Sequence, residues 1–212
     1  LTKYYGAPDK LVIRVTDNGE PVNGADIMYS RGSVSMTMTT NSQGYAYMGI
    51  ELDPGTYSVS AAYGGKSVTS KVTVKSTIMV SDLSYDYGNS YLKATFMDVY
   101  GNALADSDVQ FKIGSGTFTA KTNNNGVASS LIKLDAGEHV VTAVNPVSEE
   151  MKSFKLTVKA LEDEIYVEDG FKKVYGDSKK LKIVVKDYKG SLLSNYPLSI
   201  EIFDIWGDGY SK

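Results

Sequence analysis

The segment Asn41-Ser42-Gln43-Gly44, soon followed by Leu52-Asp53-Pro54-Gly55, decides the fold because both pieces return in the same order. Asn123-Asn124-Asn125-Gly126 and Leu134-Asp135-Ala136-Gly137 stand 82 residues further along the chain. Chance similarity rarely preserves order and spacing together, so we interpret the chain as a tandem repeat.

Two more landmarks lie outside this segment and extend the repeat. Tyr5-Gly6 recurs as Tyr87-Gly88 and again as Tyr175-Gly176. Val72-Thr73-Val74-Lys75 returns as Leu156-Thr157-Val158-Lys159, now at a spacing of 84. We therefore place repeat 1 at residues 1–75, repeat 2 at 76–160 and repeat 3 at 161–212.

The first and third repeats are expected to be incomplete. Leu181, Ile183 and Val185 continue the pattern of repeat 2, but the chain reaches Lys212 before any counterpart of the Asn-x-x-Gly turn. No counterpart of the first strands predicted for repeats 2 and 3 precedes Tyr4-Tyr5 in repeat 1. We expect repeat 1 to lack its first strand, repeat 3 to lack its C-terminal half, and the native protein to continue in both directions.

Short alternating segments indicate β-strands throughout. Leu11, Ile13 and Val15 point one way while the residues between them point the other, which is the period of a half-buried strand. Turn residues such as Asn, Asp and Gly separate these segments every 8 to 12 residues. The predicted strands are 10–16, 25–30, 34–40, 45–51, 56–63 and 67–74, with first strands Thr77–Val80 and Glu164–Val167 for the next two repeats. The fold class is all-β: tandem immunoglobulin-like antiparallel β-sandwich domains, two nearly complete and one partial.

Comparison of the two copies separates core positions from surface positions. The inward positions of strands 45–51 and 56–63 mostly stay apolar in repeat 2, the exceptions being Ser130 for Met48 and His139 for Tyr57. The core positions of repeat 1 are Ala46, Met48, Ile50, Leu52, Tyr57, Val59 and Ala61. Tyr45, Tyr47 and Glu51 become Val127, Ser129 and Lys133 in repeat 2, which indicates an outer face free to change.

Composition excludes several functional classes. The net charge is −3, so no overall positive field favours nucleic acid. The absence of cysteine excludes disulfides and thiolate metal sites, and the single His139 argues against histidine-based catalysis. No apolar run is long enough for a membrane helix. We expect no catalytic residues, cofactor or metal, and hence not an enzyme; His139, which replaces Tyr57, is interpreted as a packing residue.

Three tyrosines are the candidates for surface recognition. Tyr45 and Tyr47 share the outer face of one strand, and Tyr63 stands near the end of another. Such a platform suits a glycan or protein partner. Tyrosine on an outer strand face also occurs simply because it packs across strands, and this alternative stays open.

Charged clusters offer weaker candidates. Acidic residues near the two junctions, and a separate pair close to the C-terminus, could bind Ca²⁺, but no EF-hand spacing is present, so solvated linkers are the preferred interpretation. Lysines in repeat 3 could attract an anionic wall polymer or could simply keep strand edges soluble. The acids are Asp82, Asp86, Glu162, Asp163, Glu164, Asp204 and Asp208; the lysines are Lys172, Lys173, Lys179, Lys180, Lys182, Lys186 and Lys189.

The frame Gly19-x-Pro21-Val22-x-Gly24-Ala25, Thr39-Thr40-Asn41-x-x-Gly44-x-Ala46 and Leu52-x-Pro54-Gly55-Thr56-Tyr57 resembles bacterial immunoglobulin-like repeats of invasin- and intimin-type adhesins. It is most similar to the repeats of adhesin-like surface proteins of methanogenic archaea. It is also similar to prealbumin-like modules, so the strand topology stays open.

The resemblance implies an extracellular, cell-surface or cell-wall adhesin or stalk. The implied partners are a surface glycan or protein of another cell, a cell-wall polymer, and neighbouring repeats of the same chain. Two other hypotheses are an accessory module of a secreted enzyme and a surface filament built by strand exchange.

Overall fold

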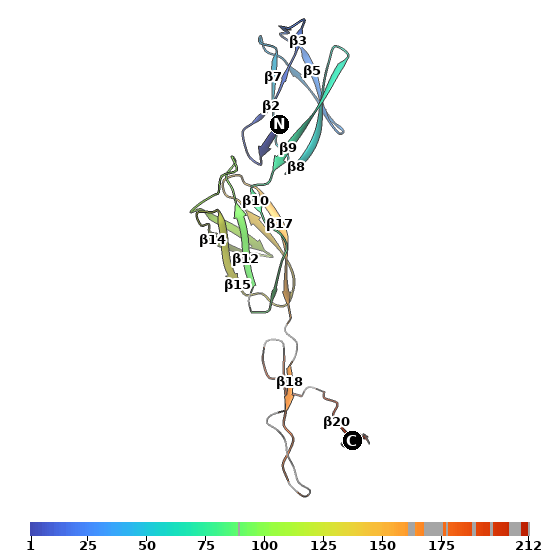
Figure 1. The fold of residues 1–212 in the computed structure, drawn as a ribbon, viewed down its shortest axis with the longest axis vertical. Helices are drawn as coiled ribbons and strands as arrows, with labels where there is room; N and C mark the ends of the chain where they lie inside the picture. Colours follow the sequence, from blue (N-terminus) through green and yellow to red (C-terminus); the bar gives the residue numbers. More distant parts are fainter. Residues whose placement is uncertain are drawn as a thin grey trace. The chain divides into compact units, whose positions relative to one another are not determined.

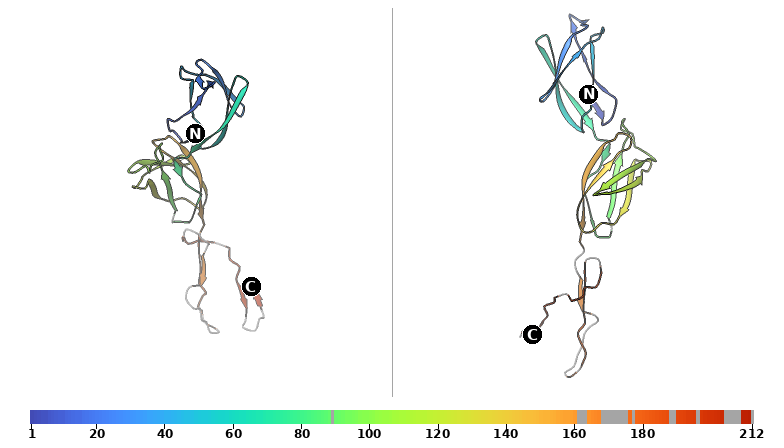
Figure 2. Two further views of the ribbon diagram at one scale, coloured as in Figure 1. Left: turned by 45° about the horizontal axis from the view of Figure 1, so that its top comes forward. Right: turned by 180° about the vertical axis from the view of Figure 1, so that it is seen from behind.

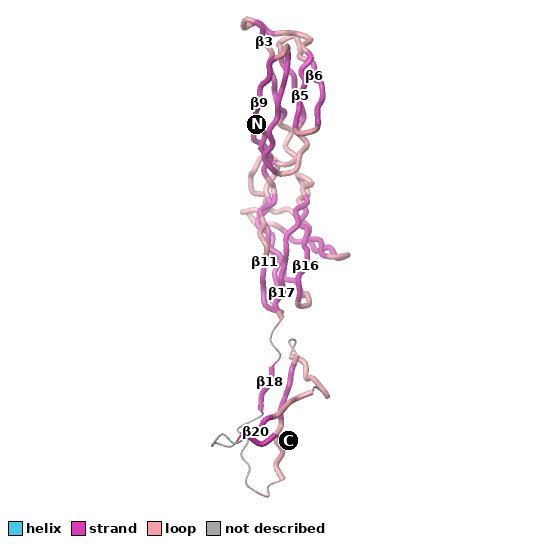
Figure 3. Tube along the Cα trace, turned by 90° about the vertical axis from the view of Figure 1, so that its right-hand side faces the viewer, coloured by secondary structure: helices cyan, strands magenta, loops and turns pink. Residues whose placement is uncertain are grey.

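The computed structural model describes residues 1–88, 90–160, 164–167, 176, 178–187, 190–195, 197–203 and 209–211. Within these ranges the chain contains β-strands and loops and no helix, so no helix could cross a membrane (Figures 1 and 3). The chain divides into two compact units. The first comprises Leu1–Leu83, Tyr91–Ile132 and Glu138–Thr157, and the second comprises Ser84–Ser90, Lys133–Gly137 and Val158–Lys212.

Repeat 1 is a sandwich of two sheets (Figure 2). The larger sheet has the order β1-β9-β8-β5-β6, and the smaller sheet pairs β2 with β7. Its strands are β1 (Thr2–Tyr4), β2 (Lys10–Arg14), β5 (Asp26–Arg31), β6 (Val34–Thr39), β7 (Tyr45–Gly49), β8 (Gly55–Tyr63) and β9 (Lys66–Lys75). A small hairpin of β3 (Thr16–Asp17) and β4 (Glu20–Pro21) turns at Asn18 and Gly19, both of which have positive φ.

Repeat 2 has the same two sheets with one strand more. The order β11-β17-β16-β13-β14 matches the larger sheet of repeat 1, and β10-β12-β15 matches the smaller one. The strands are β10 (Ile78–Met79), β11 (Leu83–Asp86), β12 (Ser90–Phe96), β13 (Asp108–Ile113), β14 (Gly116–Lys121), β15 (Val127–Ile132), β16 (Gly137–Val144) and β17 (Met151–Lys159). The predicted immunoglobulin-like sandwich is confirmed.

The two spacings in the sequence have a structural cause. β13 and β14 begin 82 residues after β5 and β6. The β8–β9 connection has two residues, Gly64 and Gly65, whereas the β16–β17 connection runs from Asn145 to Glu150. The connection is four residues longer in repeat 2, while β16 and β17 are each one residue shorter than β8 and β9, so the spacing changes by two, from 82 to 84.

The sequence analysis missed one strand of repeat 1. A strand, β1, lies ahead of Tyr5 and pairs in parallel with β9, from Thr2 opposite Thr73 to Tyr4 opposite Lys75. Three residues are too few for an alternating pattern to be visible in the sequence. β1 matches β11 of repeat 2, whereas β10 has no counterpart among the strands of repeat 1.

Repeat 3 begins as repeat 2 does. β18 (Glu164–Val167) is the predicted first strand, and it pairs antiparallel with β19 (Ile183–Lys186). After β19, Gly190 N donates to Asp187 O at 2.8 Å, as Gly101 N donates to Asp98 O at 3.1 Å in repeat 2. β20 (Glu201–Phe203) and β21 (Gly209–Ser211) form a further hairpin. The repeated landmark Tyr175 lies outside the described residues.

The Asn-x-x-Gly turn is built identically in both sandwiches. The Asn41 carboxamide oxygen accepts the amides of Gln43 and Tyr45, both at 3.0 Å. The Asn123 oxygen accepts those of Asn125 and Val127 at 2.9 and 3.0 Å. This side chain therefore satisfies the amides that the turn would otherwise leave open.

The glycine of this turn is required for two reasons. Gly44 has a φ of +77°, and a Cβ placed there would lie 2.5 Å from Val15 O. Gly126 has a φ of +73°, and its Cβ would collide with Phe96 O. The turn packs against the end of β2 in repeat 1 and of β12 in repeat 2, so it fixes how the strands of the smaller sheet come together.

Buried apolar residues fill the space between the sheets as predicted. Ala46, Ile50, Val59 and Ala61 are buried in repeat 1, and Met48, Leu52 and Tyr57 pack partly buried around them. In repeat 2 the rings of Phe96 and Phe111 meet edge to face at 6.0 Å between centroids. Such pairs contribute about 0.5–1.5 kcal/mol beyond the area they bury.

Candidate functional site

The outer face of the β2–β7 sheet carries the predicted aromatic residues Tyr45 and Tyr47. Their ring centroids lie 6.2 Å apart, with the rings tilted at 32°. Tyr47 is 53% exposed and lies opposite the exposed Val12 of β2. Tyr45 lies opposite Arg14, whose guanidinium carbon is 5.2 Å from the ring centroid. We call these four residues the tyrosine face.

The tyrosine face combines an apolar surface with one fixed positive charge. Stacking on Tyr45 holds the Arg14 guanidinium against the sheet. Exposed tyrosine and arginine side chains are the residue types that most often anchor recognition surfaces. This arrangement can stack against a sugar ring or a partner side chain and can pair with an acidic group.

Tyr63 does not belong to the same sheet. It is the last residue of β8, in the sheet opposite β7, and it is exposed at the hairpin leading to β9. The structure therefore brings together two of the three predicted residues. It adds Arg14 and Val12, which alternation along β2 already placed on an outer face.

The corresponding face of repeat 2 has different chemistry. Val127, Ser129 and Leu131 of β15 point outward where β7 has Tyr45, Tyr47 and Gly49. The tyrosine pair and its stacked arginine are therefore features of repeat 1.

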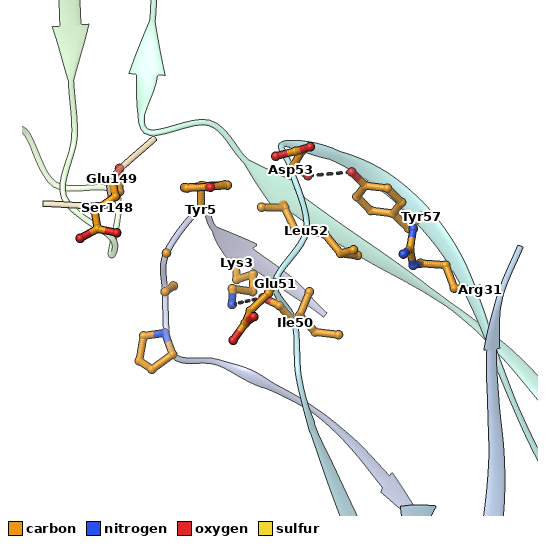
Figure 4. Close-up of a pocket in the computed structure, with 14 residues that line it drawn as sticks. Lys3, Tyr5, Arg31, Ile50, Glu51, Leu52, Asp53, Tyr57, Ser148 and Glu149 are labelled. Atoms are coloured by element: carbon orange, nitrogen blue, oxygen red, sulfur yellow. Dashed lines mark hydrogen bonds between the residues drawn. The ribbon is translucent and has the colours of Figure 1, made fainter. Parts of the chain in front are cut away.

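A second candidate site is a pocket at one end of repeat 1, which sequence reasoning missed. Its volume is about 700 Å³, and the repeated landmarks Tyr5-Gly6 and Leu52-Asp53 meet in it. Figure 4 shows Lys3, Glu51 and Arg31 around it, with Ser148 and Glu149 from the β16–β17 connection at its rim. A Cβ on Gly6 would lie 3.1 Å from Ser148 O, so this glycine allows the close approach. We call this the end pocket.

Hydrogen bonds fix the walls of the end pocket. Lys3 is buried, and its ammonium donates to Ile50 O at 2.9 Å. The Tyr57 hydroxyl donates to Asp53 O at 2.8 Å, and Arg31 lies over the Tyr57 ring at 5.5 Å. The charges that line the pocket are mixed, and its two cationic side chains, Lys3 and Arg31, are held by these contacts within the protein.

Repeat 2 forms the same pocket from the same landmarks. Tyr87, Gly88, Leu134 and Asp135 line a cavity of about 430 Å³, with Lys133 where repeat 1 has Glu51. The Tyr-Gly and Leu-Asp landmarks of the sequence therefore meet in space at one end of repeats 1 and 2. Their recurrence was the sequence signal that could have located the pocket.

A buried polar network anchors the connection between repeats 1 and 2. β9 ends at Lys75 and β10 begins at Ile78, so only Ser76 and Thr77 separate them. The Glu150 carboxylate, 3% exposed, accepts from Ser76 Oγ and Thr77 N, both at 2.6 Å. It also accepts from Thr77 Oγ1 at 2.7 Å.

Two further side chains complete this network around Thr77. Asn145 is fully buried, and its carboxamide nitrogen donates to Thr77 Oγ1 at 3.0 Å. Ser148 Oγ lies 2.6 Å from the same hydroxyl. The network (Ser76, Thr77, Asn145, Ser148 and Glu150) also reaches its surroundings, since the Asn145 carboxamide nitrogen donates to Met97 O at 2.8 Å. A satisfied buried network of this kind fixes a single geometry.

The structure adds little support for the remaining candidate sites from the sequence. His139 is partly buried on β16 at the place of Tyr57, as expected for a packing residue. No group of three or more potential metal ligands occurs in the described part of the chain. Glu162, Asp163, Asp204, Asp208, Lys172, Lys173 and Lys189 lie outside the described residues.

No protein-family model matches the chain. The sequence is 29% identical over 206 residues to the inverse autotransporter adhesin YeeJ of Escherichia coli K12, a match that covers 82% of this chain. The chain spans 9% of that protein's length. The predicted similarity to adhesin repeats is supported at this coarse level, and the closer similarity to archaeal surface proteins stays a prediction.

Several solved structures are similar in their repeated β-domains. The I9–I11 tandem of titin is 10% identical, with a TM-score of 0.42 over 96% of this chain and 82% of its own. Domains 4–9 of surface layer protein SbsC are 21% identical, with a TM-score of 0.28 over 82% of this chain and 29% of theirs. The Bacteroides ovatus protein SGBP-B, solved with a mixed-linkage heptasaccharide, is 10% identical, with a TM-score of 0.29 over 99% and 64%. At these scores the similarities carry no inference about partners.

Proposed function

We propose that this chain is a non-catalytic segment of a cell-surface adhesin or stalk. In this role its tandem repeats hold a binding surface away from the cell, and the tyrosine face of repeat 1 contributes to adhesion. The partners proposed are a glycan or protein on another cell, or a cell-wall polymer, outside the cell.

The observation that carries the proposal is the anchored connection between repeats. Only Ser76 and Thr77 link β9 to β10, and both are hydrogen-bonded to the buried Glu150 carboxylate. A short connection held in this way resists bending far more than a flexible linker does. Stiff connections between repeats are what a spacer requires, whereas they add nothing to catalysis.

The likeness to an inverse autotransporter adhesin supports the same role. So does the distribution of differences between the copies, because turn and core residues are kept while the outer sheet face changes. In a stalk each repeat adds length, and any recognition resides in the residues that are not shared.

The stalk role is tested by placing one, two or three copies of residues 1–160 between a membrane anchor and a fluorescent reporter on a cell surface. The reporter's height above the membrane, measured by fluorescence interference, is expected to rise by one constant step per copy. The matched control carries Ser76→Gly and Thr77→Gly in every copy, and its height distribution is expected to widen. A height that does not increase with copy number would overturn the proposal.

A further inference from the structure

Three asparagines of the chain are directly followed by glycine. In such a pair the glycine nitrogen can attack the asparagine side-chain carbonyl, because glycine has no Cβ to obstruct the five-membered ring that forms. The reaction needs water and base but no enzyme or bound group. The pairs are Asn18-Gly19, Asn23-Gly24 and Asn125-Gly126, and all three asparagines are exposed. Exposure therefore does not distinguish them.

Hydrogen bonds hold the pair Asn23-Gly24 in place. The Gly24 amide donates to Thr40 O at 3.0 Å. The hydroxyl of the buried Thr40 donates to Val22 O at 2.6 Å. The residues on both sides of Asn23 are thus bound to one buried threonine, and the attacking nitrogen is already engaged as a donor.

The pair Asn125-Gly126 is held in a similar way within the Asn-x-x-Gly turn. The Gly126 amide donates to Asn123 O at 2.9 Å, and the Asn125 amide donates to the Asn123 side-chain oxygen at 2.9 Å. Gly126 is buried and lies against the backbone of β12. Its nitrogen therefore cannot turn toward the Asn125 side chain unless the turn opens.

The pair Asn18-Gly19 lacks such restraints. These two residues form the turn of the β3–β4 hairpin, between Asp17 and Glu20, which lie opposite each other. Within the described part of the chain, no hydrogen bond involves the Gly19 amide. A Cβ on Gly19 would have no atom within 4 Å, so the turn also has room to change shape.

The size of the difference follows from the hydrogen bonds. A donating amide must break its bond before its nitrogen can attack, and one hydrogen bond contributes about 1 kcal/mol to the folded state. Opening that bond reduces the reactive population by a factor of about five. Gly24 and Gly126 carry this restraint, and Gly19 does not.

We propose that Asn18 is a site of spontaneous modification, at which the folded chain converts asparagine to isoaspartate and aspartate through a cyclic imide. The Gly19 nitrogen loses its proton to base and bonds to Cγ of Asn18. The bond from Cγ to the side-chain nitrogen breaks, and this nitrogen leaves as ammonia with a proton taken from water. Water then adds to one of the two imide carbonyls: cleavage at the main-chain carbonyl gives isoaspartate, and cleavage at Cγ gives aspartate.

The modification changes both the charge and the backbone of the hairpin. Either product carries a carboxylate between Asp17 and Glu20, which moves the net charge of the chain from −3 to −4. Isoaspartate also adds one carbon atom to the main chain, which a two-residue turn does not accommodate while Asp17 stays paired with Glu20. The charge and shape of this exposed hairpin therefore change with the age of the chain.

The test follows all three pairs in one sample. The full chain is incubated at physiological temperature and mildly alkaline pH, then digested, and mass spectrometry measures the conversion of Asn18, Asn23 and Asn125 over time. Fragmentation that separates isoaspartate from aspartate identifies the products. The matched control is the same chain unfolded in guanidinium, where the three glycine amides are equally available and the three asparagines should react at similar rates.

In the folded chain, Asn18 should convert at least about fivefold faster than Asn23 and Asn125. Isoaspartate should be among its products, and the rate should rise with pH because the attacking nitrogen must lose its proton. The Asn18→Asp variant adds the same charge without lengthening the backbone. The Asp17–Glu20 contact, followed by NMR, should be lost in the isoaspartate form and kept in this variant.

Three results would overturn the proposal. Equal conversion of the three asparagines in the folded chain would show that the glycine hydrogen bonds do not control the reaction. An Asn18 that reacts in guanidinium but not in the folded chain would show that the hairpin protects it. Aspartate without isoaspartate would replace the cyclic imide with direct hydrolysis of the side chain.

Discussion

Repeats 1 and 2 share their turns and core but differ at three places on their surfaces. Asn41 and Asn123 accept the same two amides in the same turn, and Gly44 and Gly126 pack on equivalent strands. The outer face of the smaller sheet, the hairpin before the last strand and the first strand all differ. The residues that build the shared fold are therefore separate from those that differ between the copies.

The hairpin before the last strand is the clearest difference. Repeat 1 turns with Gly64 and Gly65, both at positive φ, and places no polar side chain there. Repeat 2 uses a longer connection whose Asn145, Ser148 and Glu150 hold Thr77. The same position in the fold is thus a bare turn in one copy and an anchor in the other.

The largest expected effect tests whether the shared turn is equally important in both repeats. Gly44→Ala and Gly126→Ala should each lower the free energy of unfolding of their own repeat by about 3 kcal/mol or more, because the new Cβ meets a strand carbonyl. Gly19→Ala is the matched control: its φ is also positive, but no atom lies within 4 Å, so about 1–2 kcal/mol is expected. Guanidinium denaturation followed by NMR reports each repeat separately. Equal losses at Gly19 and Gly44 would show that the carbonyl contact does not matter.

The next effect separates the anchored connection from the bare turn. Glu150→Ala should lower the stability of repeat 2 by about 2–3 kcal/mol, because it leaves the buried amide and hydroxyl of Thr77 without their acceptor. Lys66→Ala, at the matching place in repeat 1, should change stability by less than about 0.5 kcal/mol. Amide exchange at Thr77 provides a second measurement, since its protection should fall only in the Glu150 variant. Unchanged exchange at Thr77 would contradict the assigned role of the network.

The sequence predicted those parts of the fold that depend on local pattern. Alternation along Leu11–Val15 and the turn residues gave the strands and the core, and β18 lies at the predicted Glu164–Val167. These features follow from rules that act within a few residues. The three-residue strand β1 was missed because its parallel pairing with β9 is a contact between residues about 70 apart.

The candidate site was only partly visible from sequence. Tyr45 and Tyr47 alternate on one strand, so their shared face followed directly, but Tyr63 lies on the other sheet. The network around Thr77 could not be predicted, because Asn145 and Glu150 come together with Thr77 only through packing of distant segments. The change of spacing from 82 to 84 shows only that repeat 2 has two more residues between Gly137 and Leu156 than repeat 1 has between Gly55 and Val72.

A smaller effect on stability, with a larger one on adhesion, is expected at the tyrosine face. Tyr47→Ser and Tyr45→Val convert it to the residues of repeat 2, and each should change stability by about 0.2–1 kcal/mol through lost cross-strand packing. Capture of cells or glycan-coated surfaces by beads carrying the chain should fall at least tenfold in the double variant. The matched control, Leu131→Ala on repeat 2, also removes an exposed apolar residue and should leave capture unchanged. If the unchanged chain, the double variant and the Leu131→Ala control capture equally well, the tyrosine face has no role in adhesion and only the spacing role remains.

The smallest effect concerns a turn that repeats 2 and 3 share but repeat 1 replaces with the β3–β4 hairpin. The Asn102 side-chain amide, which donates to Asp98 Oδ2 at 3.0 Å, and the amides of Asn102, Tyr100 and Gly101 hold the pKa of Asp98 below its ordinary value. Because this pKa is lowered in the folded state, the charged carboxylate stabilises repeat 2 above the unfolded pKa, and that contribution is lost as pH falls through the lowered one. An NMR titration of the Asp98 carboxyl should therefore show its midpoint below that of an ordinary aspartate, and Asn102→Ala should raise it. If Asn102→Ala leaves the midpoint unchanged, the backbone amides alone lower the pKa of Asp98. The acid response of this turn would then depend on its backbone geometry and not on the asparagine that distinguishes it from repeat 1.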